Sequence, residues 1–113
     1  MNDCLFCKII AGDIPSKKVW SDELCYAFYD IAPQAPTHVL IVPKTHIPSA
    51  AGINAENSGL VGHIFEVAAK LAVELGLENG WRVVTNVGED GGQSVKHLHF
   101  HLLGGKKLSL EMA

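Results

Sequence analysis

VKHLHFHLL, at residues 95–103, alternates three histidines with apolar side chains. Such alternation predicts a β-strand with two unlike faces, because successive side chains of a strand point to opposite sides. We expect Leu98, Phe100 and Leu102 to meet the core and the histidines to face a polar cleft. Three histidines on one face would span roughly 13 Å, so they could not share one tetrahedral metal ion, although two could. A polar strand face that happens to use histidine is the alternative interpretation.

Four other runs predict strands, and two predict helices. The expected strands span 17–20, 24–30, 38–43 and 81–87, and the expected helices span 4–11 and 55–77. In the longer helix apolar residues recur at three- and four-residue steps, and Gly76 provides a left-handed end. Short turns between neighbouring strands favour antiparallel pairing. The sequence therefore predicts an α+β fold, with about five antiparallel strands covered on one face by a short N-terminal helix and one long helix.

The size and composition indicate a single domain over residues 1–113. The 113 residues are 48% hydrophobic and 19% charged, which is enough apolar mass for one core. The formal net charge of −3 provides no basic field for a nucleic-acid polymer or an anionic membrane surface. The long helix is apolar on more than one face, so it is either sandwiched within the protein or shared with a second subunit, and we expect a homodimer.

The compartment is inferred from the N-terminus and the cysteines. Asp3 and Lys8 interrupt what would be the apolar region of a signal peptide, and no run approaches the roughly 18 apolar residues that span a bilayer. The three cysteines are an odd number, so reduced thiols or metal ligands are favoured over disulfides. We expect a cytoplasmic protein with no membrane partner.

Cys4 and Cys7 are spaced so that one helical turn could bring both thiolates to one Zn²⁺. No second Cys-x-x-Cys pair follows in the chain. From the spacing alone, zinc ligation and two buried structural cysteines are equally good interpretations.

A glycine-rich turn, GEDGGQS at residues 88–94, comes just before the histidines. Glycines let backbone N–H groups approach an anion closely, and amide and hydroxyl side chains add neutral donors. Such a segment is usually only a turn when it stands alone. Beside three histidines it predicts a phosphate cradle next to a nucleophile.

HLHFHLL at 97–103 resembles the signature of the histidine triad (HIT) superfamily, His-φ-His-φ-His-φ-φ with φ apolar. GGQSV at 91–95, LLGG at 102–105 and DIAPQAPTHVLIVPKTHI at 30–47 look like its Hint branch, and the resemblance covers about residues 4 to 107. It implies a HIT-like fold and a hydrolase that cleaves the P–N bond of purine nucleoside 5′-phosphoramidates. The reaction would pass through a nucleotidyl-histidine intermediate and need no catalytic metal.

Two other functions stay open at this point. One is a nucleotide-binding interaction module in which turnover is incidental. The other is dinucleoside polyphosphate hydrolysis, although such relatives usually follow the triad with a Pro-Arg type ending. The chain also lacks the Trp-Pro-Pro type tail of some Hint proteins, which leaves the amine side of the substrate less defined.

The resemblance implies a role for each matching residue. His99 would be the nucleophile, and His101 would stabilise the phosphate oxygens. Ser94 would hydrogen-bond the departing amine, His38 would orient the triad or relay protons, and Asp30 would hold the ribose hydroxyls. The apolar walls around the purine would be Phe6, Ile9, Ile14, Phe28 and Ile31, and phosphate-side contacts would come from Asn86, Gly92 and Gln93.

The resemblance also supplies two ligands that would complete a metal site. Many bacterial relatives with this N-terminal motif hold a structural zinc ion. The corresponding ligands here would be Cys4, Cys7, His46 and His97. Four such ligands make a closed structural site with no open position for catalysis. His63, on the long helix, is expected to lie on the surface.

Overall fold

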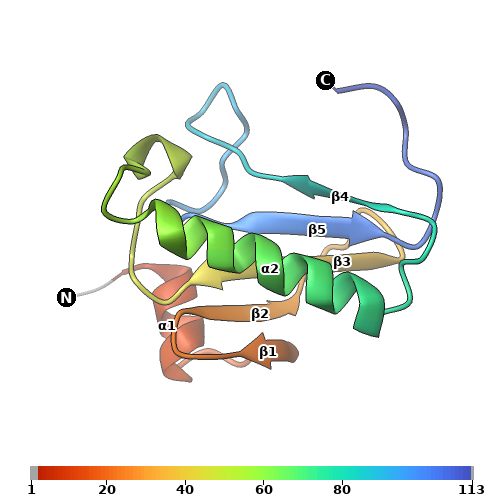
Figure 1. The fold of residues 1–113 in the computed structure, drawn as a ribbon. Coiled ribbons are helices and arrows are strands. Elements are labelled where there is room, and N and C mark those ends of the chain that lie inside the picture. Colours follow the sequence, from red (N-terminus) through yellow and green to blue (C-terminus); the bar gives the residue numbers. More distant parts are fainter. Residues whose placement is uncertain (1–2, 113) are drawn as a thin grey trace.

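A computed structural model describes residues 3–112 and has an α+β architecture (Figure 1). In chain order its elements are α1 (Leu5–Ala11), β1 (Lys18–Ser21), β2 (Cys25–Tyr29), β3 (Thr37–Pro43), the 3₁₀ helix η1 (Ala50–Gly52), α2 (Ser58–Glu74), β4 (Trp81–Val84) and β5 (Phe100–Gly104). The predicted five strands, short N-terminal helix and long helix are confirmed. Within the described residues, no helix is long and apolar enough to cross a membrane.

All five strands pair antiparallel in the order β1-β2-β3-β5-β4. β3 is the central strand and β5 lies beside it, and their register pairs His38 with Leu103 and Leu40 with His101. Side chains on one strand alternate between faces, so His38 and Leu40 share a face of β3. The register therefore carries His38 and His101 to the same region of the sheet.

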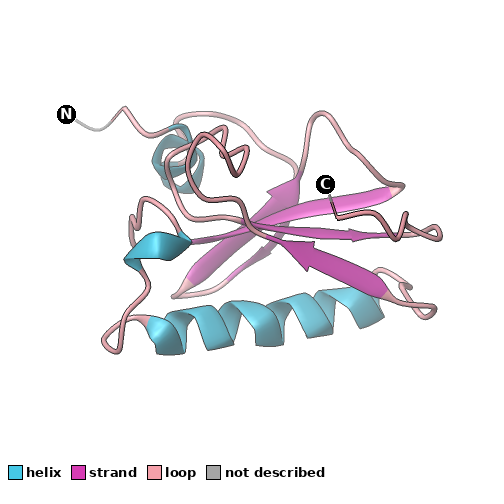
Figure 2. Ribbon diagram, turned by 90° about the horizontal axis from the view of Figure 1, so that it is seen from above, coloured by secondary structure: helices cyan, strands magenta, loops and turns pink. Residues whose placement is uncertain are grey.

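The two helices pack on opposite faces of the sheet (Figure 2). α2 covers a core that includes Val39 and Ile41, whereas α1 packs Phe6 and Ile9 against the opposite face. The prediction that helices cover only one face is therefore wrong. The physical reason lies in β3, whose near-continuous apolar run supplies buried side chains to both faces.

The strand predicted over 95–103 begins only at Phe100, and residues 95–99 form bends and irregular backbone outside the ladder. The N–H of Leu98 donates to the carbonyl of Ile47 at 2.6 Å, and the side chain of His97 turns to the carbonyl of Pro43. These contacts replace strand pairing with β4, which ends at Val84.

The side-chain prediction for this stretch is confirmed for the apolar residues and only in part for the histidines. Leu98, Phe100 and Leu102 are buried in the core under α2. His97 is fully buried and turns aside to the carbonyl of Pro43, whereas His99, which is 3% exposed, and the half-buried His101 line a cavity on the face opposite α2. His97 and His99 therefore occupy buried, hydrogen-bonded positions, whereas His101 is half-buried.

The helix ends follow the expected local chemistry. Gly76 adopts φ of +74°, the left-handed conformation that glycine reaches without strain, just beyond α2. Cys4 is the N-cap of α1, and its Sγ accepts the N–H of Cys7 at 3.4 Å. The cap residue of α1 is thus also one of the predicted metal ligands.

Candidate active site and metal centre

A cavity of about 340 Å³ lies between α1, the strand face beneath it and the segment before β5. Its apolar lining contains all five side chains that were predicted as purine walls: Phe6, Ile9, Ile14, Phe28 and Ile31. Ser94, His99 and His101 line the same cavity. Among the described residues, Asp30 is the one acidic side chain in its lining. The cavity is therefore apolar with a few convergent polar groups, as small-molecule sites usually are.

His99 is held in one tautomer. Its Nδ1–H donates to the carbonyl of His97 at 2.7 Å, so Nε2 keeps its lone pair. The ring of Phe6 meets the imidazole edge-to-face at 5.0 Å between centroids. Thr85 donates to the carbonyl of His99 at 2.8 Å, a supporting contact that no sequence signal had singled out. A fixed lone pair in an apolar cavity is what a nucleophilic imidazole needs.

A backbone amide sets the protonation of the neighbouring pair, His38 and His101. The N–H of Gln34 donates to Nδ1 of His38 at 3.0 Å, so in neutral His38 the proton is on Nε2. That Nε2 lies 2.9 Å from Nδ1 of His101 and donates to it. His101 then carries its own proton on Nε2, as a neutral N–H donor.

Both imidazoles are biased towards their neutral form. Burial, with smaller contributions from His99 and His38, lowers the pKa of His101 to about 4, while Asp30 opposes the shift. Burial also lowers the pKa of His38, again against the charge of Asp30, whose Oδ2 lies 3.5 Å from its Nε2. Of the two roles considered for His38, orientation fits this geometry better than proton relay, because its second nitrogen is occupied by a backbone N–H.

The three predicted phosphate-side residues do not line this cavity. The amide of Asn86 donates to the carbonyl of Gly91 at 2.7 Å. The amide of Gln93 donates to the carbonyls of Pro48 and Val95 and accepts the N–H of Gly88. These side chains build the glycine-rich loop, so their contact with phosphate stays a prediction, as does that of Gly92.

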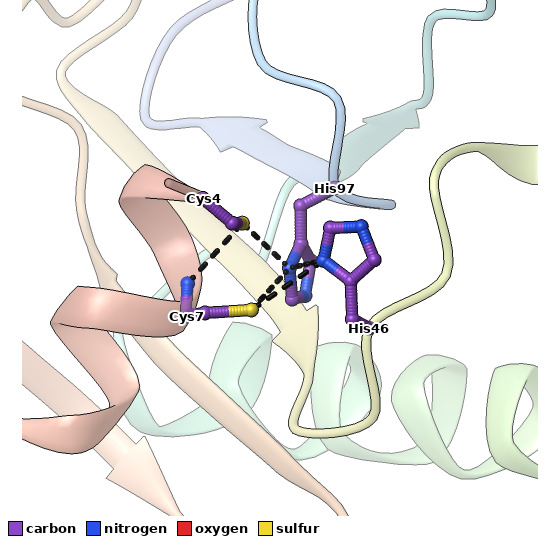
Figure 3. A group of neighbouring side chains, drawn as sticks. All are labelled: Cys4, Cys7, His46 and His97. Carbon is purple, nitrogen blue, oxygen red and sulfur yellow. Dashed lines mark hydrogen bonds between the residues drawn. The ribbon is translucent and has the colours of Figure 1, made fainter. Parts of the chain in front are cut away.

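The predicted metal ligands converge on one point (Figure 3). The set consists of Cys4, Cys7, His46 and His97, whose ligand atoms all lie within 4.8 Å of one another. Individual separations are 3.2 Å for Cys4 Sγ to His97 Nδ1, 3.4 Å for Cys7 Sγ to His46 Nδ1 and 3.1 Å between the two imidazole Nδ1 atoms. A tetrahedral zinc ion with ordinary bond lengths places such ligand atoms about 3.3–3.8 Å apart.

The orientation of His97 suits ligation. Its Nε2–H donates to the carbonyl of Pro43 at 2.8 Å, which leaves Nδ1 unprotonated towards the two sulfur atoms. Burial lowers the pKa of His97 and so favours the neutral, ligating form. Burial also raises the pKa of the Cys4 thiol, which a bound cation would reverse. The donor set therefore fits a soft divalent ion such as zinc.

Asp22 forms a polar cluster that sequence reasoning missed. Its carboxylate accepts the indole N–H of Trp20 at 2.9 Å, and Nε2 of His63 lies 2.7 Å from it. Burial alone would raise the pKa of Asp22, but these hydrogen bonds and two backbone N–H groups hold it well below its usual range. Burial, followed by the charge of Asp22, raises the pKa of the Cys25 thiol to about 12.

We had expected His63 to lie free on the surface, and this expectation is wrong. It ties α2 to the turn between β1 and β2 through Asp22. The turn is readable from the sequence, since an aspartate commonly accepts N–H groups two and three residues ahead, as Asp22 does here. Its histidine partner, 41 positions away, has no local signal.

Comparisons with known proteins identify the family of the chain. The family model described as "HIT domain" matches residues 11–108. The purine nucleoside phosphoramidase of Escherichia coli (strain K12) is 46% identical over 98% of this chain and 94% of its own length. Among solved structures, a HIT family hydrolase from Clostridium thermocellum superimposes with a TM-score of 0.97 at 44% identity, covering 100% of this chain and 99% of that one. A histidine triad protein from Clostridium difficile has a TM-score of 0.95 at 49% identity, covering 98% and 97%. The chain belongs to the HIT domain family.

Proposed function

We propose that the protein is a hydrolase that cleaves the P–N bond of purine nucleoside 5′-phosphoramidates and releases the nucleoside monophosphate. The observation that carries this proposal is His99, whose Nδ1–H is tied to a backbone carbonyl while its ring lines the apolar cavity. The phosphoramidase of Escherichia coli, which matches almost the whole chain, supports the same reaction.

The reaction is proposed in two steps. Nε2 of His99 attacks the phosphorus, the P–N bond breaks, and the departing nitrogen takes a proton from water while Ser94 hydrogen-bonds to it. Water then attacks the phosphorus of the nucleotidyl-histidine, and the bond between phosphorus and Nε2 breaks. The proton that this water loses neutralises the hydroxide left by the first step, and His99 is freed with its lone pair restored. The Nδ1–H bond to the carbonyl of His97 stabilises the positive charge that the ring carries in the intermediate.

His101 is proposed to stabilise the phosphate without carrying a charge itself. Because its Nδ1 accepts from His38, its Nε2–H is available to a phosphoryl oxygen. A preorganised neutral donor can stabilise developing charge strongly in a cavity from which water is excluded. This role requires a fixed N–H group on His101 and no positive charge.

The nucleoside end of the cavity is proposed to select a purine. The five apolar walls offer two-sided packing for a flat base, and Asp30 offers carboxylate oxygens to the ribose hydroxyls. Ile31 is completely exposed in the protein alone, so a bound base would cover an apolar surface that water now covers.

Zinc is proposed as the ion held by Cys4, Cys7, His46 and His97. When bound, it would stabilise the structure by tying α1 to the segment that precedes His99. All four positions around it would be filled by protein, so the chemical steps involve only the residues of the cavity. Thiolate ligands also suit a reducing compartment, which supports a cytoplasmic location.

A homodimer is proposed as the working form. α2 leaves Val73 80% exposed and Phe65 45% exposed, and β4 is an edge strand of the sheet. Exposed apolar side chains and an edge strand each favour a second copy as a partner. Sedimentation should give a dimer mass, and Val73→Asp should shift it towards the monomer. A monomeric wild-type protein would refute this part of the proposal.

The test of the activity is AMP release from adenosine 5′-phosphoramidate, compared with release from a dinucleoside polyphosphate. We expect the phosphoramidate to be the much better substrate, and His99→Asn to abolish turnover while the circular dichroism spectrum stays native. Unchanged turnover in His99→Asn would refute the nucleophile. Preference for the dinucleoside polyphosphate would replace the proposed reaction by the other HIT chemistry, and nucleotide binding without turnover would indicate a binding module.

A further inference from the structure

A second cavity lies behind Asp30 and continues the proposed nucleotide cavity. It measures about 680 Å³ and shares Pro15, Asp30 and Ile31 with the first. Its other lining residues are Ser16, Lys17, Tyr29, Pro33, Pro36 and His38. Because three residues line both cavities, one ligand can extend from the first into the second.

A nucleotide poised for attack by His99 would direct its ribose towards this second cavity. This step rests on the proposed function, which places phosphorus beside His99 and His101 and the base among the apolar walls. The ribose then lies between them, beside Asp30. Oδ1 of Asp30 accepts the N–H of Ala32 at 2.8 Å, which holds the carboxylate as the partition between the cavities. A substituent on the 2′ or 3′ oxygen would therefore pass the carboxylate and enter the second cavity.

The second cavity offers donors that suit an anionic substituent. Lys17 lines it, is exposed, and takes part in no ion pair among residues 3–112. The carbonyl of Lys17 accepts the N–H of Tyr29 at 3.0 Å, so these two residues are held side by side at one end of the β1–β2 pair. An ammonium group and a phenol are both donors to phosphate oxygens.

The shape of the second cavity is largely fixed. Pro15, Pro33 and Pro36 restrict the backbone at three points of its wall, so little ordering is needed when a ligand binds. The hydroxyl of Ser16 already shares a hydrogen bond with the hydroxyl of Tyr26 at 2.7 Å, and Lys17 is the charged donor among the lining residues.

We propose that the second cavity binds a phosphate group on the ribose 2′ or 3′ oxygen. The substrates of the enzyme then include purine nucleoside 5′-phosphoramidates that carry a second phosphate on the ribose, and Lys17 is a specificity-determining residue. Asp30 keeps the remaining ribose hydroxyl as its partner. The carboxylate of Asp30 repels the added phosphate, and the ammonium group of Lys17 offsets this repulsion.

The test is calorimetric binding of AMP, adenosine 2′,5′-bisphosphate and adenosine 3′,5′-bisphosphate to the full-length protein. Lys17→Gln is the test variant. Lys18→Gln is the matched control, because Lys18 is the adjacent lysine, is exposed and lines neither cavity. The 2′ and 3′ compounds separate the two positions of the added phosphate.

We expect at least one bisphosphate to bind no more weakly than AMP. Lys17→Gln should weaken the binding of that bisphosphate about fivefold, the factor for one exposed charge pair, and should change the affinity for AMP less than twofold. Lys18→Gln should change neither. The inference is overturned if both bisphosphates bind tenfold more weakly than AMP, or if the two lysine variants behave alike. Failure of AMP itself to bind would instead refute the proposed function, and this inference with it.

Discussion

Lowering the pH from 8 to 5 should leave His101 neutral, and this prediction follows directly from its surroundings. Burial lowers the pKa of His101 to about 4. At pH 5 a group with that pKa is only about one-tenth protonated, whereas an imidazole with an ordinary pKa near 6.5 is about 97% protonated. The difference is nearly the whole population of the side chain, so it is easily measured.

The assay is long-range ¹H–¹⁵N NMR of the imidazole rings, titrated between pH 8 and pH 5. The His101 signals are assigned by their loss in His101→Gln. We expect an unprotonated Nδ1 and a protonated Nε2 throughout, because Nδ1 accepts from His38. Protein unfolded in urea is the control, in which the same ring should titrate near 6.5. Titration of His101 near 6.5 in the folded protein, or a proton on Nδ1, would refute the reasoning.

Three other predictions concern the donor, the metal and the missed cluster. His101→Ala should lower kcat by about 10²–10³ with little change in KM, as loss of a transition-state donor does, and an effect on KM alone would contradict the role. Metal analysis of protein purified without chelator should find about one zinc ion per chain, and Cys7→Ser should reduce both the zinc content and the thermal midpoint. Metal-free protein that is as stable as the zinc-loaded protein would rule the site out. Asp22→Asn should lower the unfolding free energy in urea by about 1–3 kcal/mol and leave kcat unchanged. Asp90→Asn, at an exposed position, should change neither quantity, and an equal loss of stability in the two variants would argue against the cluster. Because its pKa lies below the usual range in the folded state, the contribution of Asp22 is present above about pH 4 and is lost as the pH falls further.

The sequence predicted the elements well where the local signal was strong. The long helix and its end at Gly76 follow from the apolar period and from the left-handed preference of glycine. The cavity walls and the four converging metal ligands were assigned through the HIT resemblance, and the structure brings both groups together. Spacing alone had left Cys4 and Cys7 undecided, because their two partners lie far along the chain.

The errors arose where tertiary contacts override a local pattern. The alternation at 95–103 is a genuine strand signal, but hydrogen bonds to Pro43 and Ile47 draw the first half of the stretch out of the ladder. The same departure buries His97 and His99 and fixes their tautomers. Partners such as Gln34 and Thr85 act through a backbone amide and a lone hydroxyl, for which the sequence carries no pattern.

The central claim is that His99 attacks phosphorus and becomes covalently nucleotidylated. Rapidly quenched enzyme mixed with adenosine 5′-phosphoramidate should be digested, and its peptides analysed by mass spectrometry. The account predicts an adenylyl group on His99, formed within the first turnover and absent from His99→Asn. An adenylyl group on another residue, or full turnover with no modified peptide at any quench time, would contradict it.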